Sequence, residues 1–202
     1  ACASAAYTSC MLDARLATAV HTNTALPTLD APYVDIAPAR LWLPRTSLTA
    51  CFRAIVSRST VGTSLDESQR YNHFSAYPGC SICWLFEGSV ELLEPGMPAH
   101  ASSPRREVTD RIYFCGPFTR PTITFNSPDV HGMMILMQPD AFSALTGKDS
   151  SEFLNRIVAA DEVFDAPWRE MFRAVQHAAN DDSRVAIIQE FLQPHWAASR
   201  PK

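Results

Sequence analysis

The cysteine pair Cys80 and Cys83 is the first candidate for chemistry, because Cys-x-x-Cys spacing occurs in zinc sites and in redox motifs. A structural zinc site needs four ligands, and only Cys115 and His131 could complete one here. Residues three apart in a strand face opposite sides of the sheet, and a redox motif would begin a helix rather than a strand. The spacing therefore favours a core or turn role for these thiols.

The histidines offer the second candidate chemistry. None of the six belongs to a His-x-His pair. His73 and His131 both fall in expected strands and could face one cavity, as in a metal-dependent cupin enzyme, although a hydrogen-bonded wall histidine is the simpler interpretation. No glycine-rich phosphate loop and no Gly-x-Ser-x-Gly elbow occurs. We therefore predict a protein that is not an enzyme and that uses no metal and no cofactor.

Aromatic side chains concentrate in the expected strands, and a small barrel lined by such residues can enclose one apolar ligand. The candidates for a ligand cavity are Trp84, Phe86, Tyr113 and His131. Arg120 could meet an anionic ligand, with a structural ion pair as the alternative. Plain core packing is the alternative for the aromatic residues.

These side chains need a framework of strands, which the pattern places in residues 39–138. Short β-branched and aromatic segments are separated by Pro and Gly turn signals, which is typical of an antiparallel barrel or sandwich. Apolar residues occupy both faces of segment 81–88, so this strand is expected to be central. Residues 94–110 are expected to form a polar surface loop, and residues 1–38 a partly ordered N-terminal arm.

The pattern becomes helical in residues 139–196. A capping box at 149–152 predicts a helix that carries Ile157, and Pro167 is expected in the first turn of the next helix. Pro194 is expected to end the last helix. The predicted fold class is thus α+β, a cupin-like antiparallel β-barrel or sandwich followed by a C-terminal helical segment.

Charge argues against nucleic-acid binding by this chain. The formal net charge is −4, and residues 139–202 hold ten acidic and seven basic residues, a net charge of −3. A helix-turn-helix module needs basic residues that meet phosphates. The apolar stripe of the last helix suits packing on the barrel or on a second protomer instead. The dimer-helix candidates are Val185, Ile188 and Leu192.

Several cysteines lie inside apolar runs, which favours a reducing, cytoplasmic compartment. No window holds about eighteen consecutive apolar residues, so no membrane span is predicted. The beginning of the chain also lacks the pattern of a signal peptide.

Over roughly residues 40–196 the sequence resembles the N-terminal domain of AraC-type bacterial transcription regulators. The order and spacing of several short motifs carry the resemblance: YPGCS (77–81), WLFEG (84–88), FCGPFTRP (114–121), VH (130–131), PDAF (139–142) and LTG (145–147), followed by segments 161–168 and 184–192.

The resemblance implies a cupin-like barrel that senses an unknown small-molecule effector or mediates homodimerisation. It also implies that DNA is bound only through a C-terminal helix-turn-helix domain, with the linker to that domain beginning at residues 197–202. The sequence given ends at Lys202, so we expect that domain to lie outside residues 1–202. A metal-dependent cupin enzyme and a ligand-free dimerisation module remain as alternatives.

Overall fold

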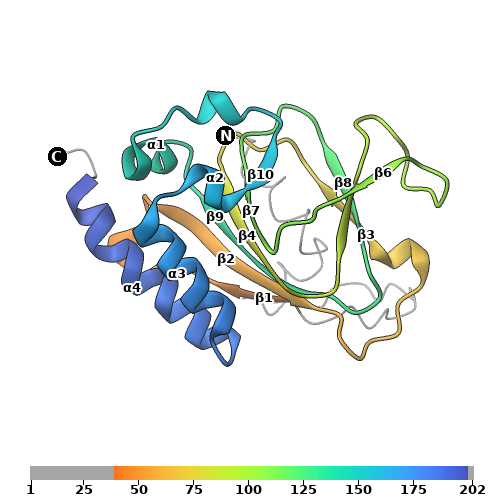
Figure 1. Ribbon diagram of the computed structural model, residues 1–202, viewed down its shortest axis with the longest axis horizontal. Coiled ribbons are helices and arrows are strands. Elements are labelled where there is room, and N and C mark those ends of the chain that lie inside the picture. The colour runs from red at the N-terminus through yellow and green to blue at the C-terminus, as the bar shows by residue number, and fades with distance from the viewer. Residues whose placement is uncertain (1–38, 200–202) are drawn as a thin grey trace, which may run out of the picture.

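The computed structural model describes residues 39–199, which form two antiparallel sheets packed as a sandwich and a group of helices (Figure 1). The N-terminal arm expected over residues 1–38 lies outside the described residues. The larger sheet has the order β1 (Ala39–Trp42), β2 (Phe52–Ser59), β9 (His131–Met137), β4 (Ser81–Glu87), β7 (Ile112–Cys115) and β10 (Ile157–Ala159). The smaller sheet has the order β3 (Tyr71–Phe74), β8 (Thr122–Asn126), β5 (Val90–Leu93) and β6 (Arg105–Glu107).

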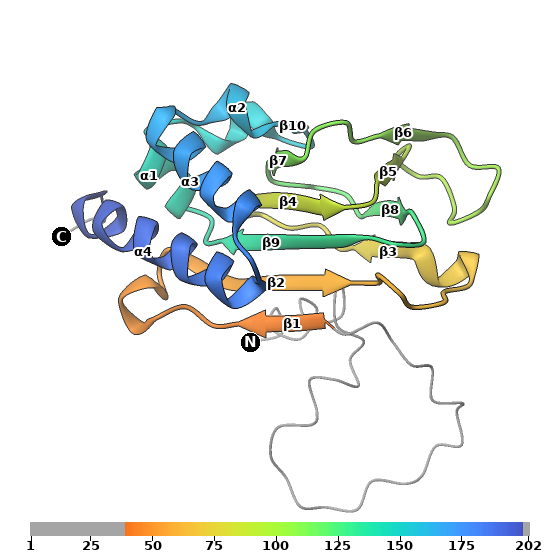
Figure 2. The same ribbon diagram turned by 60° about the horizontal axis from the view of Figure 1, so that its bottom comes forward.

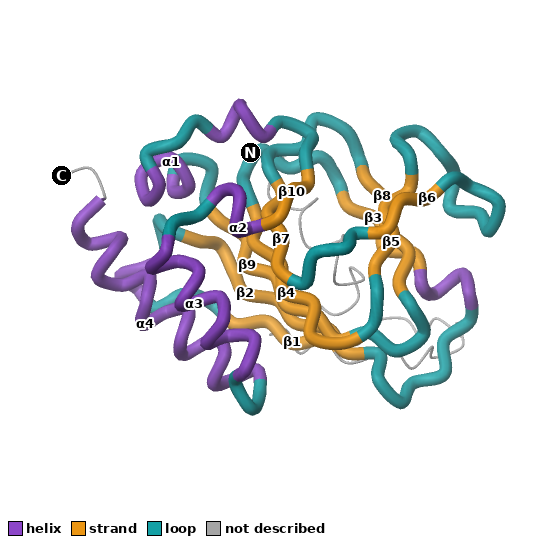
Figure 3. Tube along the Cα trace, in the orientation of Figure 1, coloured by secondary structure: helices purple, strands orange, loops and turns teal. Residues whose placement is uncertain are grey.

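The helices are α1 (Ala141–Thr146), α2 (Ala160–Val163), α3 (Ala166–His177) and α4 (Asp181–Ser199), with short 3-10 turns at Thr46–Leu48, Glu67–Arg70 and Ser150–Phe153. α3 and α4 lie side by side against the larger sheet (Figures 1 and 2). They are on the side of that sheet away from the smaller sheet (Figure 3). The α+β fold class predicted from the sequence, a sandwich followed by helices, is confirmed.

Each strand of the larger sheet has an outer face toward the helices and an inner face toward the smaller sheet, because successive side chains alternate. In β4, Ile82 and Trp84 pack in the core beneath the helices. Leu85 belongs to a second, smaller apolar cluster with Val90 of the smaller sheet. Both faces of this strand are therefore covered, which explains why neither is polar in the sequence.

The largest side chains lie between the outer face and the helices. Phe52 of β2, Phe114 of β7 and Phe172 of α3 are fully buried there, within one continuous apolar cluster. Among residues 39–199, the apolar cluster between the two sheets is the smaller one, with Val108 and Val130 among its members. The dense core is thus under the helices, and the interior of the sandwich is left less completely filled.

The structure differs from three expectations of the sequence. Ile157, expected in a helix, lies in β10 and pairs with β7. Residues 105–107, expected in a loop, form the edge strand β6. Pro194 does not end α4, which continues to Ser199. Trp196, beyond the proline, is 6% exposed and packs in the main core, so tertiary burial outweighs the local helix-breaking effect.

Within residues 39–199, no helix has both the length and the apolar character that crossing a membrane would require.

Candidate functional site: a cavity between the sheets

A cavity of about 430 Å³ lies between the two sheets. This volume falls in the range of roughly 300–1,000 Å³ that is usual for small-molecule sites. The inner face of the larger sheet contributes mainly apolar side chains, among them Ala54, Val56, Leu85, Met134 and Leu136. The smaller sheet contributes more polar ones, among them Asn72, Thr122, Thr124 and Asn126.

Strand register arranges the inner face of the larger sheet in three rows across the strands. The first row joins Arg58, Gly132 and Leu85. The second contains Val56, Met134, Cys83 and Tyr113, and the third contains Ala54, Leu136, Ser81 and Cys115. Residues two apart on a strand are separated by about 7 Å, so the rows extend over about 13 Å. The cavity wall therefore has Arg58 at one end and Cys115 at the other, and Arg53, the neighbour of Ala54 on β2, also lines the cavity.

The second and third rows of the wall hold a cluster of thiol and hydroxyl groups from β4 and β7. Cys83 hydrogen-bonds Cys115, and this bond together with burial raises the pKa of the Cys83 thiol well above 9.0, against the opposing effect of Ser81 and Tyr113. Burial, with a further contribution from the neighbouring thiols, raises the pKa of Tyr113 well above 10.0. At neutral pH Cys83 and Tyr113 are therefore uncharged, and Cys83 is a poor nucleophile.

The Cys80-x-x-Cys83 motif is divided between two environments. Cys80 is fully buried just before β4 and belongs to the core beneath the helices, whereas Cys83 lines the cavity. Burial, with a contribution from Cys115, raises the pKa of Cys80 to about 12. Both thiols are free. Among the described residues, no cluster of three or more His, Cys, Asp or Glu side chains is arranged to hold a metal ion.

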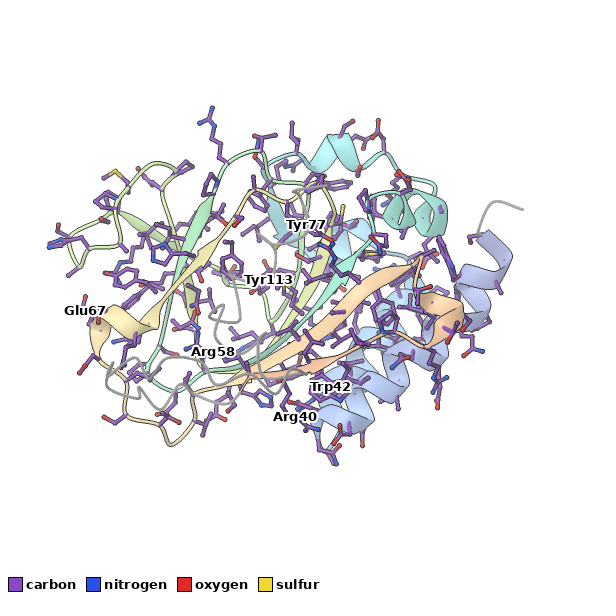
Figure 4. The ribbon with its side chains drawn as sticks, turned by 180° about the vertical axis from the view of Figure 1, so that it is seen from behind. Arg40, Trp42, Arg58, Glu67, Tyr77 and Tyr113 are labelled. Carbon is purple, nitrogen blue, oxygen red and sulfur yellow. The ribbon has the colours of Figure 1, made fainter. Side chains whose placement is uncertain are left out.

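The smaller sheet supplies the polar wall through alternate residues of β3 and β8. Asn72 sits opposite Thr124 in the pairing of these strands. The side-chain amide of Asn72 donates to Thr124 Oγ1 at 3.4 Å. Arg58 Nη1 reaches across from the larger sheet and donates to Asn72 Oδ1 at 2.5 Å. Arg58 and Tyr113 both lie between the sheets (Figure 4).

Two of the ligand-cavity candidates from the sequence line this cavity. Tyr113 does so from the second row of the wall. Trp84 borders the cavity, but its ring packs edge-on against Phe172 of α3 at 5.8 Å between centroids. Trp84 is 1% exposed, and its Nε1 has no hydrogen-bond partner in the described part of the chain.

The other three candidates lie away from the cavity lining. The rings of Phe86 and His131 contact each other at 5.0 Å on the outer face of the larger sheet, below the start of α4. Arg120 is exposed in the turn between β7 and β8. His73 is exposed on β3 in the other sheet, so the structure does not bring His73 and His131 into one cavity. The metal site considered for the two histidines is not formed.

The three dimer-helix candidates also have a defined place. Val185, Ile188 and Leu192 are 5%, 1% and 1% exposed and belong to the main core of the single chain. This is the barrel-packing arrangement left open by the sequence. A second protomer could contact these side chains only if α4 left the sheet.

The polar residues at the start of α4 form a cluster of four side chains, which we call the Asp181 cluster: Ser57, His131, Asp181 and Arg184. Ser57 Oγ and Arg184 Nη1 each donate to the Asp181 carboxylate at 2.6 Å. Burial raises the pKa of Asp181, but these hydrogen bonds and the interaction with His131 outweigh it and hold the pKa below 3.8. The cluster joins the first turn of α4 to β2 and β9.

Arg58, Asn72 and Thr124 were missed as site residues in the sequence. Two signals for them were present. Arg58 follows the apolar run 54–56 within one strand, and segment 122–126 places Thr, Thr and Asn at alternate positions. Neither signal shows which face of a strand borders empty space, because that depends on how the two sheets pack.

No protein-family model matches this sequence, and no curated protein matches it significantly. Among solved structures, this chain has a distant match to the "Crystal structure of the AraC-like transcriptional activator CuxR". The TM-score is 0.36 and the identity 12%, over 81% of this chain and 63% of that chain. This chain thus spans less than two thirds of that protein, and a likeness of this degree carries no argument about function.

Proposed function

We propose that this chain is the ligand-sensing domain of an AraC-type transcription regulator, a binding domain rather than an enzyme. The observation that carries the proposal is the cavity of about 430 Å³ between the sheets, which has an apolar wall on the larger sheet, Arg58 and Asn72 at one end and the Cys83–Cys115 pair toward the other. The sequence motifs that resemble AraC-type regulators supply the regulatory part. A cytoplasmic location and a homodimeric assembly accompany the proposal and remain predictions.

The larger sheet provides a physical route from the cavity to the helices. On β4, Cys83 and Leu85 face the cavity while the ring of Trp84, between them, contacts α3. On β2, Arg58 borders the cavity and the neighbouring Ser57 binds the start of α4. A ligand that binds one arrangement of these strands more tightly than another shifts the equilibrium between the two arrangements, by at most its difference in binding free energy. The packing of α3 and α4 would change with that equilibrium.

In this proposal the helices transmit the signal and do not contact DNA. Residues 139–202 carry a net charge of −3, which repels phosphates. DNA reading belongs to the helix-turn-helix domain that the AraC-type resemblance implies. Homodimerisation would use a surface other than the stripe of Val185, Ile188 and Leu192, which is occupied by the sheet.

The test is binding of the neutral fluorescent probe N-phenylnaphthylamine to the purified chain, followed by emission. Leu136 lines the cavity, so Leu136→Trp should fill part of it and weaken probe binding by about tenfold, or about 1.4 kcal/mol. The matched control is Leu154→Trp, at a position that is 45% exposed and outside the cavity lining. Absence of probe binding to the wild-type chain, or equal loss in the two variants, would contradict the proposal.

A further inference from the structure

Arg58 is a cation placed in the wall of an apolar cavity. It lies on the inner face of β2, in the row with Gly132 and Leu85. Within residues 39–199, its side chain hydrogen-bonds only the neutral side chain of Asn72, on the opposite sheet. Its Nε is buried and has no hydrogen-bond partner in that part of the chain.

The charge of Arg58 is not neutralised by a carboxylate in the described residues. Three other arginines of the described residues have such partners: Arg40 pairs with Asp182, Arg105 with Glu67 and Glu91, and Arg184 with Asp181. Burial lowers the pKa of Arg58 from its ordinary value, but a guanidinium stays protonated at neutral pH. A partly buried cation without an anion is unfavourable, and an anionic ligand would relieve this.

The surroundings of Arg58 define which anion fits. Asn72 and Thr124 lie beside it and offer neutral hydrogen-bonding groups. The next row of the wall lies about 7 Å from Arg58 along the strands and contains the apolar side chains of Val56 and Met134. The planar guanidinium of Arg58 matches a carboxylate through its two parallel donors, which suit the two acceptor oxygens of that group.

We propose that the cavity binds a small amphipathic carboxylate, with its anion on Arg58 and Asn72 and its apolar body along the inner face of the larger sheet. This inference rests on the proposed sensing function and names the class of effector. Arg58 acts as the anchor, and the thiol and hydroxyl groups of Cys83, Cys115 and Tyr113 lie in the second and third rows, beside the tail. Arg58 and Ser57 are neighbours on β2, and Ser57 binds the start of α4. A carboxylate bound to Arg58 therefore affects the position of the strand that holds α4.

The experiment compares two ligands that differ only in the head group. Decanoate and decanol are titrated against the bound N-phenylnaphthylamine probe at mildly alkaline pH, where the carboxyl is ionised. The wild-type chain should bind decanoate about tenfold more tightly than decanol, since a charge-assisted hydrogen bond is stronger than a neutral one. Arg58→Met should abolish this preference while the affinities for decanol and for the probe stay unchanged.

The matched control is Arg106→Met, at an exposed position of β6 outside the cavity lining, which should keep the preference. Arg58→Lys keeps the charge without the two parallel donors and should retain part of it. Equal wild-type affinities for decanoate and decanol, or a preference that survives Arg58→Met, would overturn the carboxylate inference while probe binding still supported a sensor. A wild-type chain that binds no probe would remove the proposed function as well.

Discussion

His131 Nε2 lies 3.1 Å from Asp181 Oδ1, and this contact joins β9 to the first turn of α4. Asp181 also accepts hydrogen bonds from Ser57 of β2 and from Arg184, one turn along α4. Arg184 is 8% exposed and its guanidinium lies 3.7 Å above the ring of Phe86. The carboxylate is therefore the common partner of groups that would otherwise be buried without one.

Replacing Asp181 with Asn should destabilise the fold by about 1–3 kcal/mol, because the variant leaves the buried Arg184 without its anion. Urea unfolding followed by circular dichroism measures the change. Asp161→Asn, on the exposed surface of α2, is the matched control and should stay within about 0.5 kcal/mol of the wild type. A loss no larger at position 181 than at position 161 would show that the cluster does not hold α4.

The pH dependence of stability should report the same carboxylate. The folded-state pKa of Asp181 is below 3.8, so the folded state binds fewer protons than the unfolded state in this region. This stabilisation is complete above the unfolded pKa and is lost as the pH falls through it toward the folded pKa. The difference in unfolding free energy between the wild type and Asp181→Asn should therefore decrease as the pH is lowered from neutral to strongly acidic values. A constant difference across that range would contradict this assignment.

The stripe of α4 should act as core rather than as a dimer surface. Ile188→Ala is expected to lower the unfolding free energy by about 2–5 kcal/mol, since Ile188 is 1% exposed. Gln193→Ala, on the exposed side of the same helix, should have little effect. Light scattering on the same samples separates the two roles. A change of molecular mass for Ile188→Ala without a loss of stability would restore the dimer-helix interpretation.

The two faces of the larger sheet should respond differently to one substitution. Tyr113 lines the cavity, and Phe86 lies on the outer face against His131. Tyr113→Leu should change the affinity for N-phenylnaphthylamine severalfold, while Phe86→Leu should leave it unchanged and lower stability by about 1 kcal/mol. Probe titration and thermal unfolding of both variants check this. An equal effect of the two changes on probe affinity would mean that the probe does not occupy the space between the sheets.

The sequence predicted the fold class well because the strand pattern and the helical spacing of apolar residues are local patterns. It placed Pro167 in the first turn of α3, where the structure has it. It failed at Ile157 and at Pro194, where pairing with β7 and burial of Trp196 override local preference. The site was harder to predict, because β4 is apolar on both faces. Alternation separated Trp84 from Cys83, but only the packing of the sheets shows which of them borders empty space.

Hydrogen–deuterium exchange of the chain with and without saturating N-phenylnaphthylamine tests most directly whether the larger sheet links the cavity to the helices. We predict slower exchange in β2, β4 and β9, whose inner faces line the cavity, together with slower exchange in the first turns of α4, which the Asp181 cluster joins to β2 and β9. Slower exchange in the strands with an unchanged α4 would contradict the link. Exchange that the bound probe leaves unchanged in all three strands would contradict the cavity as the ligand site.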